Sequence, residues 1–363
     1  MQDRIKILFI LKRKETYNDE YNQGRNVVED GGYGMETGLL NSASFVNDML
    51  NHNNFDSHLV VVHDNNDIDR EVTKYRPDIV VLEALWVVPE KFAVLLPLHP
   101  KVKWIVRLHS ATPFISNEGI AMKWILSYIS HKNVSVSCND DRILKEIRFL
   151  IKHKFQWGDI KMNKKVLYQP NFYPLKYKNK ELDRNKEVID IACFGAIRPM
   201  KNQLIQAVAA LEFADSIGKK LHFHINGNRV EMKGAPVLHN IVALFEHVEH
   251  RGHKLIIHDW CSHSDFKKVC SEMDIALQVS FTETFNIVAA DLVSEGVPLV
   301  ASSEVKWSTT FGHADPNDVQ SIVKKLKFVW RYPQFNVFLN QRFLKRYCKN
   351  SVVVWKEELK KLC

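Results

Sequence analysis

The segment from Asp274 to Ser302 constrains the fold of this chain more than any other. Its first part, IALQVSF, is too apolar for a half-exposed strand and predicts one buried on both faces, as in a parallel sheet. Apolar residues then recur at helical spacing from Phe285 to Val293, and GVP ends that helix before the strand LVAS. Such a strand–helix–strand unit is typical of a doubly wound α/β sheet. Ligands bind there at the carboxyl edge, which here carries the loop SFTETFN.

Two carboxylates flank the start of this helix. Glu283 lies in the loop and Asp291 eight positions later, a little over two helical turns away, so both can border one crevice. The alternative is that Glu283 only complements the positive end of the helix dipole and that Asp291 is solvated. Both interpretations remain open at this point.

Length and composition predict two domains in a reducing compartment. A chain of 363 residues with 45% hydrophobic content is long for one core. The polar segment 176–186 predicts a linker between an N-terminal domain, 1–175, and a C-terminal domain, 186–345. The early apolar run IKILFIL contains a lysine and lacks a cleavage site, so a first strand is expected rather than a signal peptide. The six cysteines form no CxxC pair or zinc-ligand spacing, which favours a cytoplasmic protein without a bound metal.

In the first domain, strands predicted at 4–11, 58–62, 78–82, 104–109 and 134–138 alternate with helical segments, which indicates a parallel sheet. The loop DGGYGMETG precedes a helix, and Gly32 and Gly34 would let backbone N–H groups approach a phosphate or sugar. Flexible loops use glycine as often for plain turns. His109 ends the strand WIVRLH at the carboxyl edge, where a ligand contact and a structural role are about equally expected.

The second domain begins with the strand VIDIACFG, 188–195, followed by AIRPMKN and a helix. Arg198 and Lys201 therefore lie in a strand-to-helix loop, where cationic side chains and helix N–H groups can jointly hold an anion. Further strands are predicted at 221–227 and 254–260. Trp260, at the end of the latter, would either stack on a base or pack between helices.

These motifs resemble those of a known family. GAIRPMKN looks like the loop G-R-x-x-x-K-[GN], and TETFNIVAADLVSEGVPLVAS looks like E-P-F-G-x-x-x-x-E-A-x-A-x-G-x-P-V-V-A. Between residue 188 and about residue 326 the chain thus resembles the retaining glycosyltransferases of the GT-B fold, of the glycosyltransferase family four type (group 1). It departs from the pattern at Thr284, Asn286 and Asp291, where the family has Pro, Gly and Glu.

The resemblance implies two Rossmann-like doubly wound domains facing each other across a cleft, with a last helix, 350–363, that packs back on the first domain. It implies a metal-independent hexosyltransferase without a cofactor, which moves a sugar from a nucleotide-diphosphate donor to a hydroxyl of a glycan, lipid-linked or other acceptor. The catalytic residues that it implies are Glu283, His109, Lys201 and Arg198. The donor-binding residues that it implies are Gly195, Asn202, Trp260, Thr284, Phe285, Asn286, Ile287, Asp291, Gly32 and Gly34.

Within that scheme, Arg198 and Lys201 would bind the diphosphate, Glu283 the sugar hydroxyls and Asp291 the ribose. Backbone N–H groups around Phe285 would hold the phosphates. No carboxylate in the sequence is obviously placed as a covalent nucleophile, so a same-face displacement is expected.

The basic charge of the chain is concentrated in two segments. Residues 141–180 hold 11 Lys/Arg against 3 Asp/Glu, and residues 321–363 hold 11 against 2, whereas the whole chain has a net charge of +8. Peripheral contact with an anionic membrane surface or nucleic acid is one expectation; a solvated face that only keeps the protein soluble is the other. Three further functions remain open: a nucleotide-sugar epimerase of the same fold, a nucleic-acid-binding protein, and a glycosyltransferase acting on modified DNA.

Overall fold

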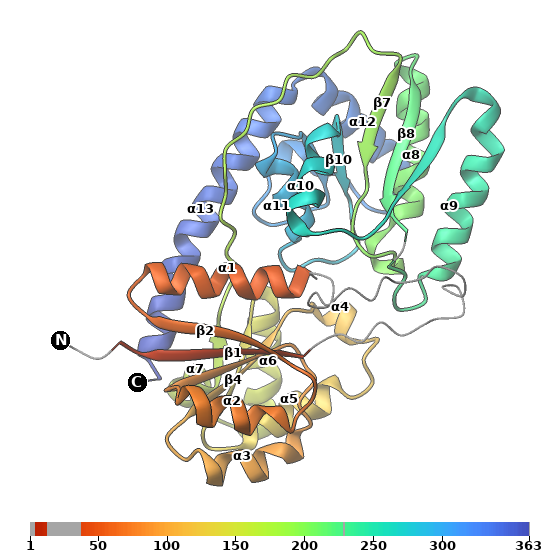
Figure 1. The fold of residues 1–363 in the computed structure, drawn as a ribbon. Helices are drawn as coiled ribbons and strands as arrows, with labels where there is room; N and C mark the ends of the chain where they lie inside the picture. The colour runs from red at the N-terminus through yellow and green to blue at the C-terminus, as the bar shows by residue number, and fades with distance from the viewer. Residues whose placement is uncertain (1–3, 13–37, 228, 363) are drawn as a thin grey trace. The chain divides into compact units, whose positions relative to one another are not determined.

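A computed structural model describes residues 4–12, 38–227 and 229–362, and the chain divides into two compact units (Figure 1). Unit 1 comprises Met1–His109, Glu118–Pro170 and Val354–Cys363. Unit 2 comprises Ser110–Asn117 and Asn171–Val353. The segment 171–175 thus lies in unit 2, and of the segment 350–363 only the part from Val354 lies in unit 1.

Unit 1 is built on a parallel sheet in the order β2-β1-β3-β4-β5-β6. Its strands are β1 (Lys6–Lys12), β2 (Asp56–Val62), β3 (Ile79–Glu83), β4 (Lys103–Leu108), β5 (Val134–Cys138) and β6 (Val166–Tyr168). Every residue of β3 and β5 is buried, as expected for strands covered on both faces. The three-residue β6 was not predicted, because a run this short gives no periodic signal.

The principal helices of unit 1 are α1 (Gly38–His52), α2 (Asp67–Tyr75), α3 (Phe92–Leu98), α5 (Ala121–Ser130), α6 (Asp141–Phe155) and α7 (Asp159–Lys165). Asp140 caps α6, because its side chain accepts hydrogen bonds from the backbone N–H groups of Arg142 and Ile143. The left-handed Gln156 follows the last turn of α6.

Unit 2 contains a second parallel sheet in the order β11-β10-β7-β8-β9. Its strands are β7 (Val188–Ala192), β8 (Lys220–Asn226), β9 (Lys254–His258), β10 (Ile275–Gln278) and β11 (Leu299–Ala301). Its helices include α4 (Thr112–Ile115), α8 (Gln203–Ser216), α9 (Ala235–Val248), α10 (His263–Glu272), α11 (Ile287–Ser294) and α12 (Val319–Arg331).

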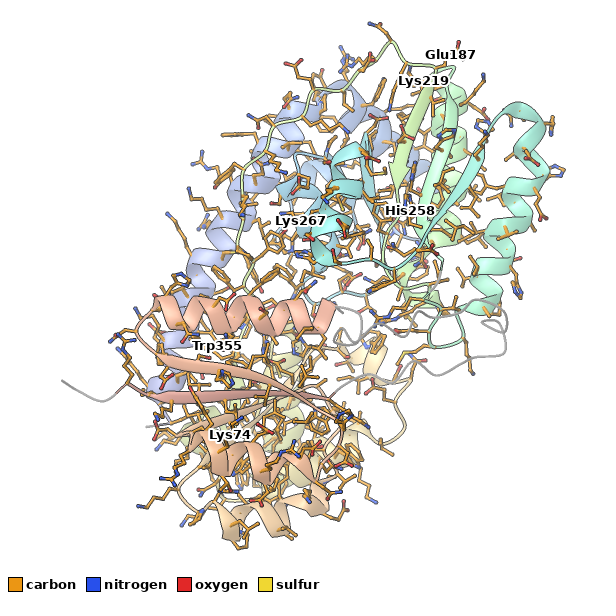
Figure 2. All side chains as sticks on the ribbon, viewed as in Figure 1. Lys74, Glu187, Lys219, His258, Lys267 and Trp355 are labelled. Atoms are coloured by element: carbon orange, nitrogen blue, oxygen red, sulfur yellow. The ribbon has the colours of Figure 1, made fainter. Side chains whose placement is uncertain are left out.

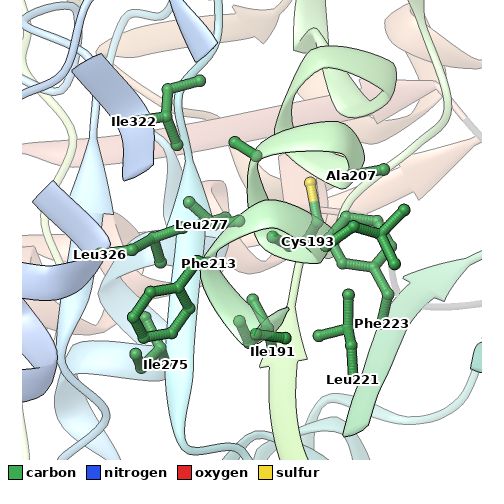
Figure 3. Close-up of a cluster of buried hydrophobic side chains, with 14 of the residues drawn as sticks. Ile191, Cys193, Ala207, Phe213, Leu221, Phe223, Ile275, Leu277, Ile322 and Leu326 are labelled. Carbon is green, nitrogen blue, oxygen red and sulfur yellow. The ribbon is translucent and has the colours of Figure 1, made fainter. Parts of the chain in front are cut away.

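The main hydrophobic core of unit 2 lies on one face of this sheet (Figure 3). Ile191, Leu221 and Phe223 from β7 and β8 pack there with apolar residues of α8, α9 and α12. Because side chains alternate across a strand, the intervening residues of β7 and β8 point to the opposite face.

The long helix α13 (Pro333–Lys360) belongs to unit 2 up to Val353 and to unit 1 beyond it. Within unit 1, Trp355 is fully buried, with its ring centroid 6.0 Å from that of Phe9. Its indole Nε1 donates to the carbonyl of Pro170 at 2.7 Å, and the guanidinium of Arg107 lies 5.1 Å from the ring centroid. The last turns of the chain are therefore part of the core of unit 1.

The prediction of an α/β protein with two doubly wound parallel sheets is confirmed. Within the described ranges, no helix combines the length and the apolar character that a membrane crossing requires.

Candidate functional site

The chain order of the strands in unit 2 reverses between β7 and β10, which are hydrogen-bonded neighbours. From β7 the chain continues through α8 to β8 on one side; from β10 it continues through α11 to β11 on the other. In doubly wound sheets a crevice opens at the carboxyl end of such a switch point. The loops 193–202 and 279–286 follow β7 and β10 at this end of the sheet.

Gly195 shapes the first of these loops. Its φ is +116°, a conformation that L side chains rarely adopt, and its N–H donates to Oδ1 of Asn226 at 2.9 Å. Apart from its two chain neighbours, no atom of the described residues lies within 4 Å of where a Cβ would be. The backbone conformation, rather than crowding by the described residues, therefore requires glycine.

Lys201 and Glu283 meet at this edge although they are 82 residues apart in sequence. Lys201 Nζ lies 2.5 Å from Glu283 Oε1, and the amide of Asn286 donates to the same oxygen at 3.2 Å. The side chains of Lys201 and Glu283 are 19% and 10% exposed, so the pair is largely buried but still accessible to a ligand. Two residues that sequence motifs alone suggested thus form one ion pair at the carboxyl edge.

Arg198 is held by a residue that sequence reasoning missed. Its Nε donates to Glu231 Oε2 at 2.8 Å, and its Nη2 contacts the same oxygen. Glu231 Oε1 accepts from Arg229 Nε at 2.6 Å. A lone glutamate in a loop after a strand has no motif, so only the folded structure identifies Glu231 as the partner of two arginines.

Trp260 is half-buried after β9, and the guanidinium of Arg229 lies 4.8 Å from its ring centroid. This cation–π contact uses the aromatic system that a base would use. A base that stacks on Trp260 therefore has to share the ring with Arg229 or displace it.

The start of α11 depends on Asn286. Its φ is +60°, and its Oδ1 caps the helix by accepting from the N–H of Ala289 at 2.9 Å. The family pattern has glycine here, and asparagine is among the few other residues that tolerate a left-handed backbone. The Asn286 amide also donates to Gln278 Oε1 at 2.8 Å.

The residues around this cap are anchored by packing. Phe285 is buried against Trp307, whose indole Nε1 donates to the Phe285 carbonyl at 2.6 Å. Thr284 and Ile287 are half-buried on either side. The first turn of a helix has N–H groups without intrahelical partners and carries partial positive charge, so it suits an anion.

Asp291 is buried, with 2% of its surface exposed, so its interpretation as a solvated residue is wrong. Its Oδ1 accepts hydrogen bonds from the Tyr173 hydroxyl and from His263 Nε2, both at 2.7 Å. Burial, together with the nearby Asp291 charge, raises the pKa of Tyr173, which therefore stays a donor. Tyr173 and His263 are distant in sequence from Asp291, and no pattern predicted these contacts.

Asn202 has a structural part in the site. It is buried at φ +60°, and its amide donates to the carbonyls of Val279 at 3.1 Å and Pro316 at 2.8 Å. Gln206 makes a further hydrogen bond to the same segment, because its Oε1 accepts from the N–H of Val279 at 2.7 Å. These contacts fix the loop that carries Lys201 to the end of β10.

In unit 1, His109 immediately follows β4, and its Nε2 contacts Glu83 Oε2. Glu83 is fully buried and also accepts from Arg107 Nη1 at 3.1 Å. Burial lowers the pKa of His109, although the Glu83 charge opposes that shift. Gly32 and Gly34 lie outside the described residues.

Comparison with solved structures gives extensive matches at low identity. A sucrose-phosphate synthase from Thermosynechococcus elongatus matches with a TM-score of 0.66 and 11% identity over 99% of both chains. A UDP-forming α,α-trehalose-phosphate synthase from Burkholderia xenovorans matches with a TM-score of 0.64 and 10% identity over 98% of both chains. A trehalose-6-phosphate synthase studied for glycosyl transfer with retention matches with a TM-score of 0.59 and 10% identity over 82% of this chain and 77% of that one. No family model and no curated protein matches the sequence.

The fold is therefore the GT-B fold of glycosyltransferases. At 10 to 11% identity the likeness extends to the fold and does not single out family four among the families that share it.

Proposed function

We propose that this protein is a retaining glycosyltransferase that moves a sugar from a nucleotide-diphosphate donor to an acceptor hydroxyl. The observation that carries the proposal is the Lys201–Glu283 pair at the switch point of unit 2, next to the N-terminus of α11. A fixed cation, a helix N-terminus and a carboxylate at one sheet edge suit a ligand that combines phosphates with sugar hydroxyls.

In this proposal the diphosphate contacts Lys201, Arg198 and the first N–H groups of α11. The C1–O bond of the donor sugar breaks with its electron pair passing to the diphosphate, which gains negative charge. Preorganised cations and N–H groups stabilise that charge without reorganising. Retention then follows if the acceptor oxygen attacks from the face that the diphosphate leaves, with its proton passing to the leaving group.

The carboxylates of Glu283 and Asp291 have separate roles in this proposal. Glu283, whose charge Lys201 balances, accepts hydrogen bonds from hydroxyls of the donor sugar, because carboxylates pair well with diols. Asp291 has its Oδ1 occupied by Tyr173 and His263, so we assign the ribose contact to Oδ2. The contact of His109 with the donor sugar stays a prediction from the family resemblance.

The structural neighbours suggest substrates to test first. One of the three structures compared above is named as UDP-forming, and all three are named as synthases of a phosphorylated sugar. We therefore propose UDP as the leaving group and a phosphorylated sugar as the acceptor, in a cytoplasmic, metal-independent reaction. An anionic acceptor also agrees with the basic charge of segments 141–180 and 321–363.

The test begins with thermal shift of the full chain against UDP, GDP, ADP and their sugars. The matching nucleotide at 100 times its dissociation constant adds about 2.7 kcal/mol of stability. Transfer to a panel of free and phosphorylated sugars is then followed by nucleotide release and by NMR of the anomeric product. We expect Lys201→Ala to lower turnover roughly a hundredfold, a typical loss for one preorganised stabiliser.

Lys327→Ala is the control, because Lys327 is an exposed lysine on α12 of the same unit. Equal turnover in the folded Lys201→Ala and Lys327→Ala variants would contradict the site. If the protein converts the nucleotide sugar to its epimer in the absence of an acceptor, its function is epimerisation and not glycosyl transfer.

A further inference from the structure

Three side chains with metal-ligating atoms gather on the face of the unit 2 sheet opposite its core. Asp190 lies on β7, and His222 and His224 lie on the neighbouring β8. The strand register pairs Asp190 with His222 and Ala192 with His224. Because Ile189, Ile191, Leu221 and Phe223 face the core, strand alternation directs Asp190 and the two histidines to the other side.

The donor atoms of this cluster lie close to the spacing that one ion requires. Asp190 Oδ1 lies 3.1 Å from His224 Nε2 and 3.4 Å from His222 Nδ1, and one ligand atom from each of the three side chains lies within 4.8 Å of the others. Four ligands at roughly 2.0–2.1 Å around a tetrahedral zinc ion lie about 3.4 Å apart. Small side-chain adjustments therefore place all three atoms on one ion.

A third histidine, His258, orients the buried member of the cluster, His224. His224 Nδ1 lies 2.8 Å from His258 Nε2 of β9, and the two rings stack with centroids 5.1 Å apart. When His224 donates its Nδ1 proton to His258, its Nε2 lone pair points toward Asp190. Ligating histidines commonly make such a hydrogen bond through the nitrogen that does not bind the metal. His258 is labelled in Figure 2.

The carboxylate of Asp190 is oriented in a corresponding way. Lys186 Nζ contacts Asp190 Oδ2 at 2.7 Å and also pairs with Asp274. Oδ2 is therefore committed to the lysine, and Oδ1 faces the imidazoles. The side chains of His222 and Asp190 are 28% and 22% exposed, whereas that of His224 is 9% exposed, so an ion reaches the cluster from solvent.

We propose that Asp190, His222 and His224 form a binding site for a divalent transition-metal ion of the zinc type, with a water molecule as the remaining ligand. Two imidazoles and one carboxylate favour such an ion over Mg²⁺ or Ca²⁺, which prefer all-oxygen sites. The site cross-links β7 and β8 in mid-strand, and its residue on β7, Asp190, comes five positions before Gly195 of the following loop. It is distinct from the residues proposed to bind the donor and does not depend on that proposal.

The experiment uses the full chain after treatment with a chelator. Co²⁺ is added as a spectroscopic probe, and Zn²⁺ affinity is measured by competition with a chromophoric chelator. We expect one Co²⁺ per chain with the visible absorption of a low-coordinate site, and a rise in melting temperature with Zn²⁺. His222→Asn is expected to weaken Zn²⁺ binding at least tenfold, whereas His247→Asn, an exposed histidine on α9, leaves it unchanged.

His258→Phe provides the second variant, because it keeps an aromatic ring but removes the acceptor for His224. We expect it to weaken binding about 10- to 100-fold, the usual effect of losing such a partner. Absence of a low-coordinate Co²⁺ spectrum in the wild-type chain would overturn the proposal. Equal Zn²⁺ affinity of wild type and folded His222→Asn would overturn it as well, by placing the ion elsewhere.

Discussion

Asn286 links the backbone conformation at the start of α11 to the orientation of Glu283. Its side chain caps the helix and donates to Gln278 and to Glu283, while its own backbone is left-handed. Asparagine both adopts a left-handed backbone and caps the helix, so it can stand where the resembled motif has glycine, and the turn is kept. The substitution that looked like a departure in sequence is therefore compatible with the same local geometry.

We expect Asn286→Ala to destabilise the protein more than Asn286→Gly. Alanine loses the cap, at about 1 kcal/mol, and also holds a left-handed backbone, at roughly 1–2 kcal/mol. Glycine loses the side-chain hydrogen bonds but adopts the backbone freely. Urea denaturation of both variants measures the difference, and equal stability would show that the positive φ carries no cost.

In the proposed reaction the two carboxylates Glu283 and Asp291 have different roles. Glu283→Gln keeps the shape but loses charge-assisted bonds to the sugar, so transfer falls while nucleoside diphosphate affinity is largely kept. Asp291→Ala weakens binding of the nucleotide itself. Calorimetry with the diphosphate alone separates the two, and the reverse pattern would mean that the two roles are exchanged.

Tyr173→Phe is the matched control for Asp291→Ala. It removes one of the two donors to Asp291 Oδ1 but leaves the carboxylate and the His263 contact in place. Nucleotide affinity is expected to change less than in Asp291→Ala. An equal loss in both variants would assign the effect to disturbed packing rather than to a ribose contact.

At the scale of elements, the final turns of α13 complete the core of unit 1 through Trp355. The indole is fully buried against Phe9 and Arg107, and its N–H satisfies the Pro170 carbonyl. A C-terminal segment could therefore not be assigned to a domain by its place in the chain. The family resemblance predicted a last helix at 350–363, and the position of Trp355 identifies what the end of that helix covers.

Trp355→Ala is expected to cost about 3–5 kcal/mol, the usual range for deleting a large buried aromatic side chain. Val353→Ala is the control, because Val353 lies two residues earlier in the same helix and is 52% exposed. Denaturation followed by circular dichroism compares the two variants. A loss below about 1 kcal/mol for Trp355→Ala would show that the helix end contributes little to unit 1.

At the scale of the whole molecule, the basic excess is only partly available to a partner. In segment 141–180, Arg148 donates to the Val166 carbonyl and Lys180 to the carbonyls of Ser271 and Met273. Lys145, Lys152 and Lys154 on α6 are exposed. Fewer cationic side chains can therefore contact an anionic partner directly than the sequence count suggests.

We predict that the chain binds anionic vesicles or DNA at low salt through this exposed part of α6, and that moderate salt weakens the binding. Replacing Lys145, Lys152 and Lys154 by Glu should reduce sedimentation with vesicles or the gel shift. The same replacement at Lys74, Lys101 and Lys132, also exposed and in unit 1, changes net charge equally. Equal effects would indicate attraction by net charge alone, and no binding at low salt would favour a soluble acceptor.

The sequence by itself determined most of the elements and the class of fold. Buried strands such as β1 and β3 appear as continuous apolar runs, and helices appear through their period, because both signals are local. The loops that carry Arg198, Lys201 and Glu283 were found from motifs of a few neighbouring residues for the same reason.

Only the tertiary structure decided which side chains meet. The Lys201–Glu283 pair, the Tyr173 and His263 contacts of Asp291, and the Asp190–His224 contact join residues 28 to 118 positions apart. Their proximity depends on strand order and register in the second sheet. These follow from packing of the whole chain, because parallel strands are paired through crossovers and each neighbour is distant in sequence.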